Sequence, residues 1–179
     1  TMMAIKSASL GESMQILKRE ATLWRLRINT DDDLWSLARL ARRGMSLGML
    51  GERRDQTTAG EEGGRAKSAE RKKMWIKLRI ESTEYQSYSE VFRVHGIIEE
   101  AKIDLGSYHT HNISIGDEVE LTCQTPFLET DIVLLQQAVD ASQQVQIALA
   151  VVENDEVILF HITPRGLRES TTSVSYTHL

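Results

Sequence analysis

Three consecutive carboxylates, Asp31, Asp32 and Asp33, are the best candidates in this sequence for holding a divalent metal ion. Metal-assisted cleavage of a phosphodiester bond needs carboxylates that hold the ion and a water molecule positioned beside it. Consecutive residues of a helix do not share a face, so at most two of the three can converge on one ion. The alternative interpretation is structural, since aspartates at the start of a helix cap its free N–H groups and compensate its dipole.

His109 is the candidate general base of the sequence, because the pKa of an unperturbed histidine lies near neutrality. His109 and His111 are two residues apart, which places both side chains on one face if this segment is a strand. A zinc site would need a third and usually a fourth ligand, and the sequence shows no pattern that supplies them. His109 is therefore also interpreted as a structural residue that makes hydrogen bonds.

Basic residues gather in one segment of an acidic chain. The formal net charge is -5, but residues 50–73 contain seven Lys or Arg and five Asp or Glu, which leaves +2 there and -7 elsewhere. Because phosphate affinity comes from locally placed cations, RNA contact is expected from Arg53, Arg54, Arg65, Lys67, Arg71, Lys72 and Lys73. The alternative is a solvated hairpin tip of mixed charge. Aromatic residues make up 6% of the chain, so the composition does not indicate a base-stacking platform.

The other bulk properties favour a cytoplasmic monomer without a membrane partner. A single cysteine, Cys123, excludes an internal disulfide and fits a reducing compartment. It follows Val119 and Leu121 in an alternating pattern, which indicates a buried strand position rather than a nucleophile. No apolar run approaches the roughly 20 residues that span a bilayer. Residues 1–13 lack the apolar region of a signal peptide.

Hydrophobic periodicity predicts a mainly β protein with two helices, an α+β arrangement. One helix is expected over residues 31–43, with acidic residues at its start and basic residues at its end. The other is expected over residues 130–142, where Thr130 is the predicted cap and Ile132 and Leu135 lie on one side.

Alternating or continuous apolar segments predict the strands, which lie at about 14–20, 22–28, 45–57, 74–81, 89–98, 118–123, 145–153 and 157–162. Residues 58–69 are rich in Gly, Ala and charge, which is typical of a loop that projects between two strands. The change to nearly continuous apolar runs after residue 144 indicates the start of a second domain.

Five short motifs follow one another along the chain: Asp32-Asp33-Leu34-Trp35, Gly51-Glu52-Arg53-Arg54, Leu105-Gly106-Ser107-Tyr108-His109-Thr110, Ile115-Gly116-Asp117 and Ala148-Leu149-Ala150-Val151-Val152. As an ordered set they resemble the Pelota family of archaeal type, which is paralogous to class I release factors. The resemblance covers residues 14–168. Release factors carry a Gly-Gly-Gln loop for peptide release, whereas here Gly63-Gly64 is followed by Arg65, which agrees with subunit dissociation instead.

The resemblance implies a particular domain organisation. Residues 14–143 are expected to form an Sm-like β-barrel N-terminal domain, preceded by an extension over residues 1–13. Residues 144–173 are expected to begin a central, release-factor-like domain. Residues 174–179 are unlike the family and are expected to be a non-native tail on a truncated chain.

The function implied by the resemblance is recognition of stalled ribosomes through the decoding site and the mRNA channel, in ribosome rescue and no-go mRNA decay. The implied partners are small-subunit RNA, mRNA and, through domains missing here, an EF1A-like translational GTPase. One alternative is a divalent-metal-dependent endoribonuclease that cleaves stalled mRNA, with Asp32, Asp33 and His109 as catalytic candidates and Asp31–Asp33 as metal candidates. Another is an Sm-like protein-interaction module. No cofactor is implied except the divalent cation that the nuclease alternative would require.

Overall fold

The chain forms two compact units, each built on its own antiparallel sheet. The computed structural model describes residues 2–6, 13–54, 71–86, 88–141, 147–153, 156–163 and 166–172. The larger unit is Ser13–Val139, and the smaller unit combines Thr1–Glu12 with Asp140–Leu179. Arg65, Lys67 and the tail at 174–179 lie outside the described residues.

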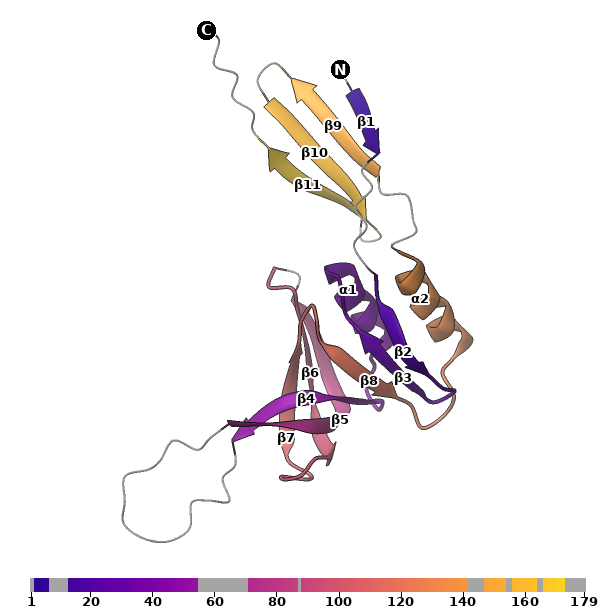
Figure 1. Cartoon of the computed structure of the whole chain (residues 1–179), viewed down its shortest axis with the longest axis vertical. Helices are drawn as coiled ribbons and strands as arrows, with labels where there is room; N and C mark the ends of the chain where they lie inside the picture. The colour runs from indigo at the N-terminus through magenta and orange to yellow at the C-terminus, as the bar shows by residue number, and fades with distance from the viewer. Residues whose placement is uncertain are drawn as a thin grey trace, which may run out of the picture. The chain divides into compact units, whose positions relative to one another are not determined.

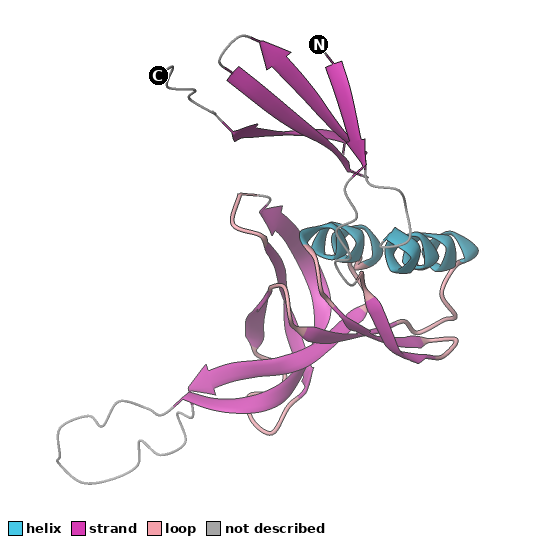
Figure 2. Ribbon diagram, turned by 45° about the horizontal axis from the view of Figure 1, so that its top comes forward, coloured by secondary structure: helices cyan, strands magenta, loops and turns pink. Residues whose placement is uncertain are grey.

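The larger unit is a seven-stranded sheet with two helices, α1 (Asp31–Leu40) and α2 (Glu129–Asp140), which lie on one side of it (Figures 1 and 2). The strand order is β2-β3-β8-β4-β5-β6-β7. This architecture confirms the mainly β class with two helices. The strands are β2 (Gln15–Arg19), β3 (Leu23–Arg27), β4 (Ser46–Arg54), β5 (Arg71–Gln86), β6 (Val91–Glu100), β7 (Tyr108–Ile113) and β8 (Glu118–Thr122).

Helix α1 begins at a capping box. The Thr30 side chain accepts a hydrogen bond from the Asp33 N–H, and the Asp33 carboxylate reaches back to the Thr30 N–H. The helix buries its leucines and ends at Ala41, whose backbone is extended. The predicted end at residue 43 is therefore too late, and Arg42 lies just beyond the helix.

Helix α2 begins at Glu129, one residue before the predicted start. The Asp131 carboxylate accepts the Leu128 N–H at 3.2 Å, so Thr130 lies in the first turn and the predicted cap is wrong. Ile132 is 36% exposed, whereas Asp131, Leu135 and Ala138 are buried, so the side of α2 that carries Ile132 and Leu135 is only partly buried. Among the described residues, no helix has the length and apolar character to cross a membrane.

A bidentate ion pair joins the end of α1 to the start of α2. Arg42 donates to the two Asp131 carboxylate oxygens at 2.6 and 2.8 Å. The hydrogen bonds from Arg42 lower the pKa of Asp131, although burial opposes them. The ion pair therefore links the segment after α1 to the first turn of α2.

The sheet curls around a main core, and a second, smaller cluster of Met74, Ile76, Leu78 and Ile98 lies apart from it. Residues from β3 through β8 meet the leucines of α1 in one hydrophobic cluster, which a flat sheet of this width would not allow. Two irregularities in the β5–β6 register, at Lys77/Leu78 and Ile80/Ser82, bend the strands. Gly96 lies opposite this bend, where an added Cβ would come 2.0 Å from the Arg79 carbonyl oxygen. The bend therefore requires glycine at this position.

The backbone ladder of this sheet stays open in the part of the chain that the structure describes. Strand β4 pairs with β8 at Ser46–Gly48 alone, and β2 and β7 form the two edges. Side chains near the far end of β4 nevertheless contact β7, since Arg53 bonds to Tyr108. The closed barrel thus stays a prediction.

The smaller unit contains a four-stranded antiparallel sheet in the order β1-β9-β10-β11. Strands β9 (Ile147–Glu153) and β10 (Glu156–Thr163) match the two apolar runs of the sequence. The outer strands, β1 (Met2–Lys6) and β11 (Gly166–Thr172), carry no strong periodic signal and were not predicted. Strand β1 lies within the residues that were interpreted as an extension.

Candidate nucleic-acid interface

The β4–β5 hairpin carries the basic residues of the candidate interface. Its outer ends extend beyond the rest of the sheet (Figures 1 and 2). The register places Arg53 opposite Lys72 and Arg54 opposite Arg71. Lys73 is opposite Glu52 and is exposed. Five of the seven predicted RNA-contact residues thus lie together on two paired strands.

Arg53 is the most constrained of these cations. Its guanidinium forms an ion pair with Asp104 and donates to the Tyr108 carbonyl oxygen at 3.3 Å. A guanidinium nitrogen also lies 3.3 Å from His109 Nδ1. These contacts link β4 to β7. The Arg53 side chain is 19% exposed, so it has less freedom to follow a ligand.

His109 and His111 lie on the inner side of β7, and their rings meet edge to face with centroids 4.9 Å apart. His111 Nε2 lies 3.0 Å from the Ile76 carbonyl oxygen. Burial lowers the pKa of His111 to about 4, against the effect of this hydrogen bond. Burial and, secondly, the Arg53 charge lower the pKa of His109. Both shifts favour the neutral form of the imidazole.

Gly51 of β4 gives these rings their space. An added Cβ would lie 3.2 Å from His111 Cε1 and 3.4 Å from His109 Nε2. Contacts at this distance are tighter than most real Cβ contacts, so a side chain at Gly51 would push the rings away. The hairpin and the two histidines therefore form one packed group, the hairpin base: Gly51, Arg53, Asp104, Tyr108, His109 and His111.

The three aspartates of the first motif lie at the start of α1. The Asp33 carboxylate accepts the N–H groups of Asn29 and Thr30 at 2.9 and 2.8 Å. Burial raises the pKa of Asp33, while these hydrogen bonds lower it. Asp31 accepts the Tyr85 hydroxyl at 2.6 Å. The capping interpretation is confirmed for Asp33, whose Oδ2 accepts both backbone N–H groups.

Metal-binding groups are sparse in the described part of the chain. No set of three or more His, Cys, Asp or Glu side chains there has an arrangement that could hold a metal ion. The aspartates belong to α1, whereas His109 belongs to β7. The geometry thus gives no support to joining them in one catalytic group.

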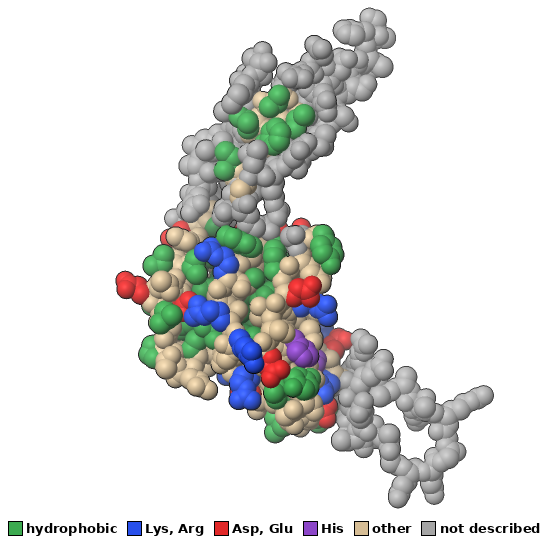
Figure 3. Space-filling model, turned by 180° about the vertical axis from the view of Figure 1, so that it is seen from behind, with side chains coloured by type: hydrophobic (Ala, Val, Ile, Leu, Met, Phe, Trp, Pro, Cys, Tyr) green, Lys and Arg blue, Asp and Glu red, His purple; other side chains and the backbone are tan. Residues whose placement is uncertain are grey.

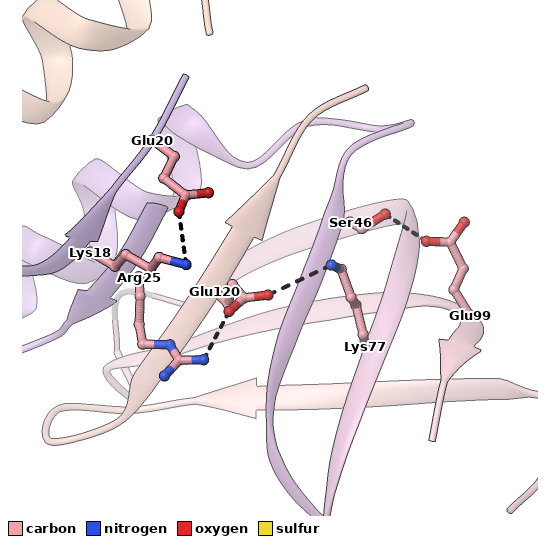
Figure 4. Close-up of polar contacts among 7 residues, drawn as sticks. All are labelled: Lys18, Glu20, Arg25, Ser46, Lys77, Glu99 and Glu120. Carbon is pink, nitrogen blue, oxygen red and sulfur yellow. Dashed lines mark hydrogen bonds and ion pairs between the residues drawn. The ribbon is translucent and has the colours of Figure 1, made fainter. Parts of the chain in front are cut away.

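On the outer sheet face, many basic side chains have acidic partners. Arg25 donates to Glu120 at 2.9 Å, and Lys77 lies 3.6 Å from the same carboxylate (Figure 4). Lys18 and Glu20 form a similar pair at 2.8 Å. Figure 3 shows acidic side chains among the basic ones on one face of this unit. Mixed charge of this kind does not make a continuous phosphate-binding surface.

Comparison with known proteins decides the family. The sequence model described as the Pelota N-terminal domain matches residues 11–139. The chain belongs to this Pelota family. A Pelota homologue of Methanothrix thermoacetophila is 30% identical over 128 residues, which is 72% of this chain and 35% of the homologue.

Two solved Pelota structures share the fold. One is a model of ribosome-bound archaeal Pelota and ABCE1, with a TM-score of 0.60 and 22% identity over 91% of this chain and 45% of that chain. The other is the crystal structure of Thermoplasma acidophilum Pelota, with a TM-score of 0.58 and 22% identity over 87% of this chain and 42% of that one. The chain spans less than half the length of each of these relatives.

Two of the Pelota-like motifs meet in space at the hairpin base. Arg53 comes from the motif on β4, and it contacts Tyr108 and His109 from the motif that leads into β7. More than 50 residues separate them in the chain. Neither motif contains a periodic signal that points to the other, so their contact could not be predicted from the sequence.

Sequence reasoning missed Asp104, Tyr108 and Asp131 as partners of functional or structural arginines. Asp104 has a φ of +60°, in the left-handed region where aspartate is one of the few residues tolerated. A turn over residues 104–106 was detectable from Asp104 and Gly106, and it would have indicated strand β7. Nothing in the sequence identified Arg53 as the partner of that turn.

Proposed function

We propose that this chain recognises stalled ribosomes and takes part in ribosome rescue, with the β4–β5 hairpin as its RNA contact. Membership of the Pelota family supports the role, and one relative of this fold is described as ribosome-bound. The observation that carries the proposal is the hairpin register, which sets arginine and lysine opposite one another at the extended end of two strands.

Charge supports an anionic ligand at this place. Like charges that lie directly opposite in a sheet destabilise it. The register sets Arg54 opposite Arg71, and Lys72 opposite Arg53, whose own counter-ion is Asp104; an anionic ligand would relieve the repulsion within such pairs. RNA phosphates supply one, and RNA is recognised largely through its shape and backbone. The hairpin base anchors the inner end of the β4–β5 hairpin to β7. The basic residues at the outer end therefore lie on two strands that are held in place.

The test removes the three basic residues of β5 that are not part of the hairpin base. We expect the triple variant Arg71→Ala, Lys72→Ala, Lys73→Ala to bind small ribosomal subunits more weakly. The log-log salt dependence should flatten by about 0.7–0.9 per lost phosphate contact. The measurement is equilibrium binding of the 179-residue chain across a salt series.

A matched control removes the same charge elsewhere. Lys18, Arg19 and Lys102 are exposed and lie outside the hairpin, so their triple alanine variant should keep the wild-type salt slope. If both triple variants lose affinity equally, the contact is a general charge effect and the hairpin proposal fails. If neither does, RNA is not bound here.

We also propose the finer features that the resemblance implies. The curled sheet is the Sm-like element, closed between β4 and β7 by side chains such as Arg53 in place of a backbone ladder. Contact with an EF1A-like translational GTPase would use parts of a full-length relative beyond this chain. A binding assay of this chain with such a GTPase should accordingly give no complex.

A further inference from the structure

We propose that the outer face of β6 and β7 stacks an unpaired nucleobase of RNA on the ring of Tyr108. This inference rests on the proposed function, since it assigns the same RNA ligand a second contact. The surface, called the Tyr108 face, consists of the outward side chains Arg93, His95, Ile97, Tyr108, Thr110 and Asn112.

The sheet register builds this face. Strand β7 alternates, so that Tyr108, Thr110 and Asn112 point away from the core side, where His111 and Ile113 are buried. Tyr108 is opposite Ile97, and Thr110 is opposite His95. Tyr108 and His95 are thus diagonal neighbours, a separation that aromatic side chains bridge.

Two rings form a parallel stack on this face. The His95 and Tyr108 ring centroids are 5.4 Å apart, and the ring planes differ by 5°. This is an offset stack, a favoured arrangement of aromatic rings. Tyr108 is nevertheless 60% exposed. Because His95 covers one face of the Tyr108 ring, this exposure leaves the other face of the ring open to solvent.

Both rings are held before any ligand arrives. His95 Nδ1 lies 2.8 Å from Thr110 Oγ1. Arg53 donates to the Tyr108 carbonyl oxygen, so the hairpin base fixes the backbone that carries the ring. An exposed aromatic ring of fixed orientation loses little conformational entropy when a base stacks on it.

The neighbouring groups suit a nucleotide. Base–aromatic stacking tolerates any base because every base has a π-face. Exposed Asn112 has both a donor and an acceptor for a base edge. Arg93 faces Glu84 at 3.7 Å and remains 46% exposed, so its charge is weakly paired and accessible to a phosphate. The acids Glu84 and Glu99 keep the local charge near balance, so affinity should come mainly from stacking.

The experiment compares two ligands of equal charge. The 179-residue chain is titrated with fluorescein-labelled oligoadenylate of nine nucleotides and with an abasic ribose-phosphate oligomer of the same length. Wild type should bind oligoadenylate more tightly. Tyr108→Ala should weaken oligoadenylate binding at least about five-fold and leave abasic binding unchanged. Tyr108→Phe keeps the ring and should bind as wild type does.

Tyr88 supplies the matched control, because it is a tyrosine of the β5–β6 turn that is 85% exposed. Tyr88→Ala should bind both oligomers as wild type does. Thermal melting of each variant checks folding. If Tyr108→Ala is unfolded, Tyr108→Leu keeps the apolar bulk and should show the same loss of base-dependent binding.

Three results would overturn the inference: equal oligoadenylate affinity in Tyr108→Ala and wild type, equal wild-type affinity for both oligomers, or no saturable wild-type binding at about 1 mM. If Tyr108→Ala weakens subunit binding but not oligoadenylate binding, the face contacts a protein instead. Failure of the hairpin proposal can be distinguished from failure of this one. The triple hairpin variant should change the salt slope for both oligomers, whereas the Tyr108 variants should leave that slope unchanged.

Discussion

The start of α1 and the hairpin base both gather titratable side chains, but the fold uses them in different ways. At α1 the group is consecutive in sequence, and the Asp33 carboxylate binds backbone N–H groups. At the hairpin base the group comes from three separate segments, and its side chains bind one another. A run of consecutive acidic residues is therefore a weaker indicator of a functional site than a group of residues that come together only on folding.

The largest expected effect concerns the buried histidine of the hairpin base. The pKa of His111 is lowered from 6.5 to about 4, so the unfolded state takes up the proton first on acidification. The contribution of the neutral His111 to the free energy of unfolding should be fully present above about pH 6.5. The free energy of unfolding should fall by about 3 kcal/mol as the pH drops to 4. The measurement is the free energy of unfolding in urea from pH 8 to pH 4.

The variant His111→Gln keeps a donor for the Ile76 carbonyl and should flatten this pH dependence. His109→Gln is the matched control, and it should flatten the dependence less, because His109 is less buried than His111. A wild-type unfolding free energy that stays constant down to pH 4 would contradict the burial argument.

Removal of the Asp33 side chain should cost about 2 kcal/mol of stability. The Asp33→Ala variant leaves the Asn29 and Thr30 N–H groups without their carboxylate acceptor. Urea denaturation at pH 7 measures the change. Asp32→Ala tests the neighbouring acid, and we expect a change within about 0.5 kcal/mol. Equal losses in the two variants would show that the capping box has no special role.

Arg53→Ala should alter the hairpin base with a smaller loss of stability, about 1 kcal/mol or less. The pKa of His109 should rise, because a cation that lowers it is removed, yet it should stay below the ordinary value since burial remains the larger cause. Nuclear magnetic resonance titration of the histidine ring measures this shift. Arg93→Ala serves as the control, and a His109 pKa that does not move would mean that the Arg53 contact is weak.

The smallest expected effect is on RNA cleavage. Purified chain mixed with a labelled RNA hairpin should show no metal-dependent cleavage with Mg²⁺ or Mn²⁺ beyond that in EDTA. The double variant Asp32→Asn, Asp33→Asn should match wild type, since Asp33 is engaged at the start of the helix. Cleavage that needs metal and falls by orders of magnitude in a folded double variant would restore the nuclease hypothesis.

The sequence predicted what local periodicity encodes. Both helices and the strands around Trp24, Ile76, Val94 and Leu121 followed from alternation or helical spacing. Strand β7 was missed, because Tyr108–Ile113 mixes polar and aromatic residues on both faces. Its inner histidine His111 is buried by the curvature of the sheet, and curvature depends on bulges that a single sequence does not reveal.

Composition predicted which basic residues belong to the candidate interface, but it did not predict their contacts in the fold. Of the seven predicted cations, five lie on the paired strands β4 and β5, and Arg65 and Lys67 lie outside the described residues. The pairing of Arg53 with Asp104 depends on a contact across 51 residues, which composition does not reveal. Contacts between distant residues also explain why the low aromatic content did not predict the Tyr108 face. Two rings that are 13 residues apart in sequence become neighbours through strand register alone.

The pairing of β1 with β9 has a consequence for the order in which the chain folds. Met2–Lys6 is made before the larger unit, and its partner Ile147–Val151 is made some 140 residues later. At a synthesis rate of about 5–20 residues per second, roughly 7 to 28 seconds pass before the partner strand of β1 is made. The residues of the larger unit emerge within that interval, so this unit should fold first and bring the ends of the smaller sheet within reach.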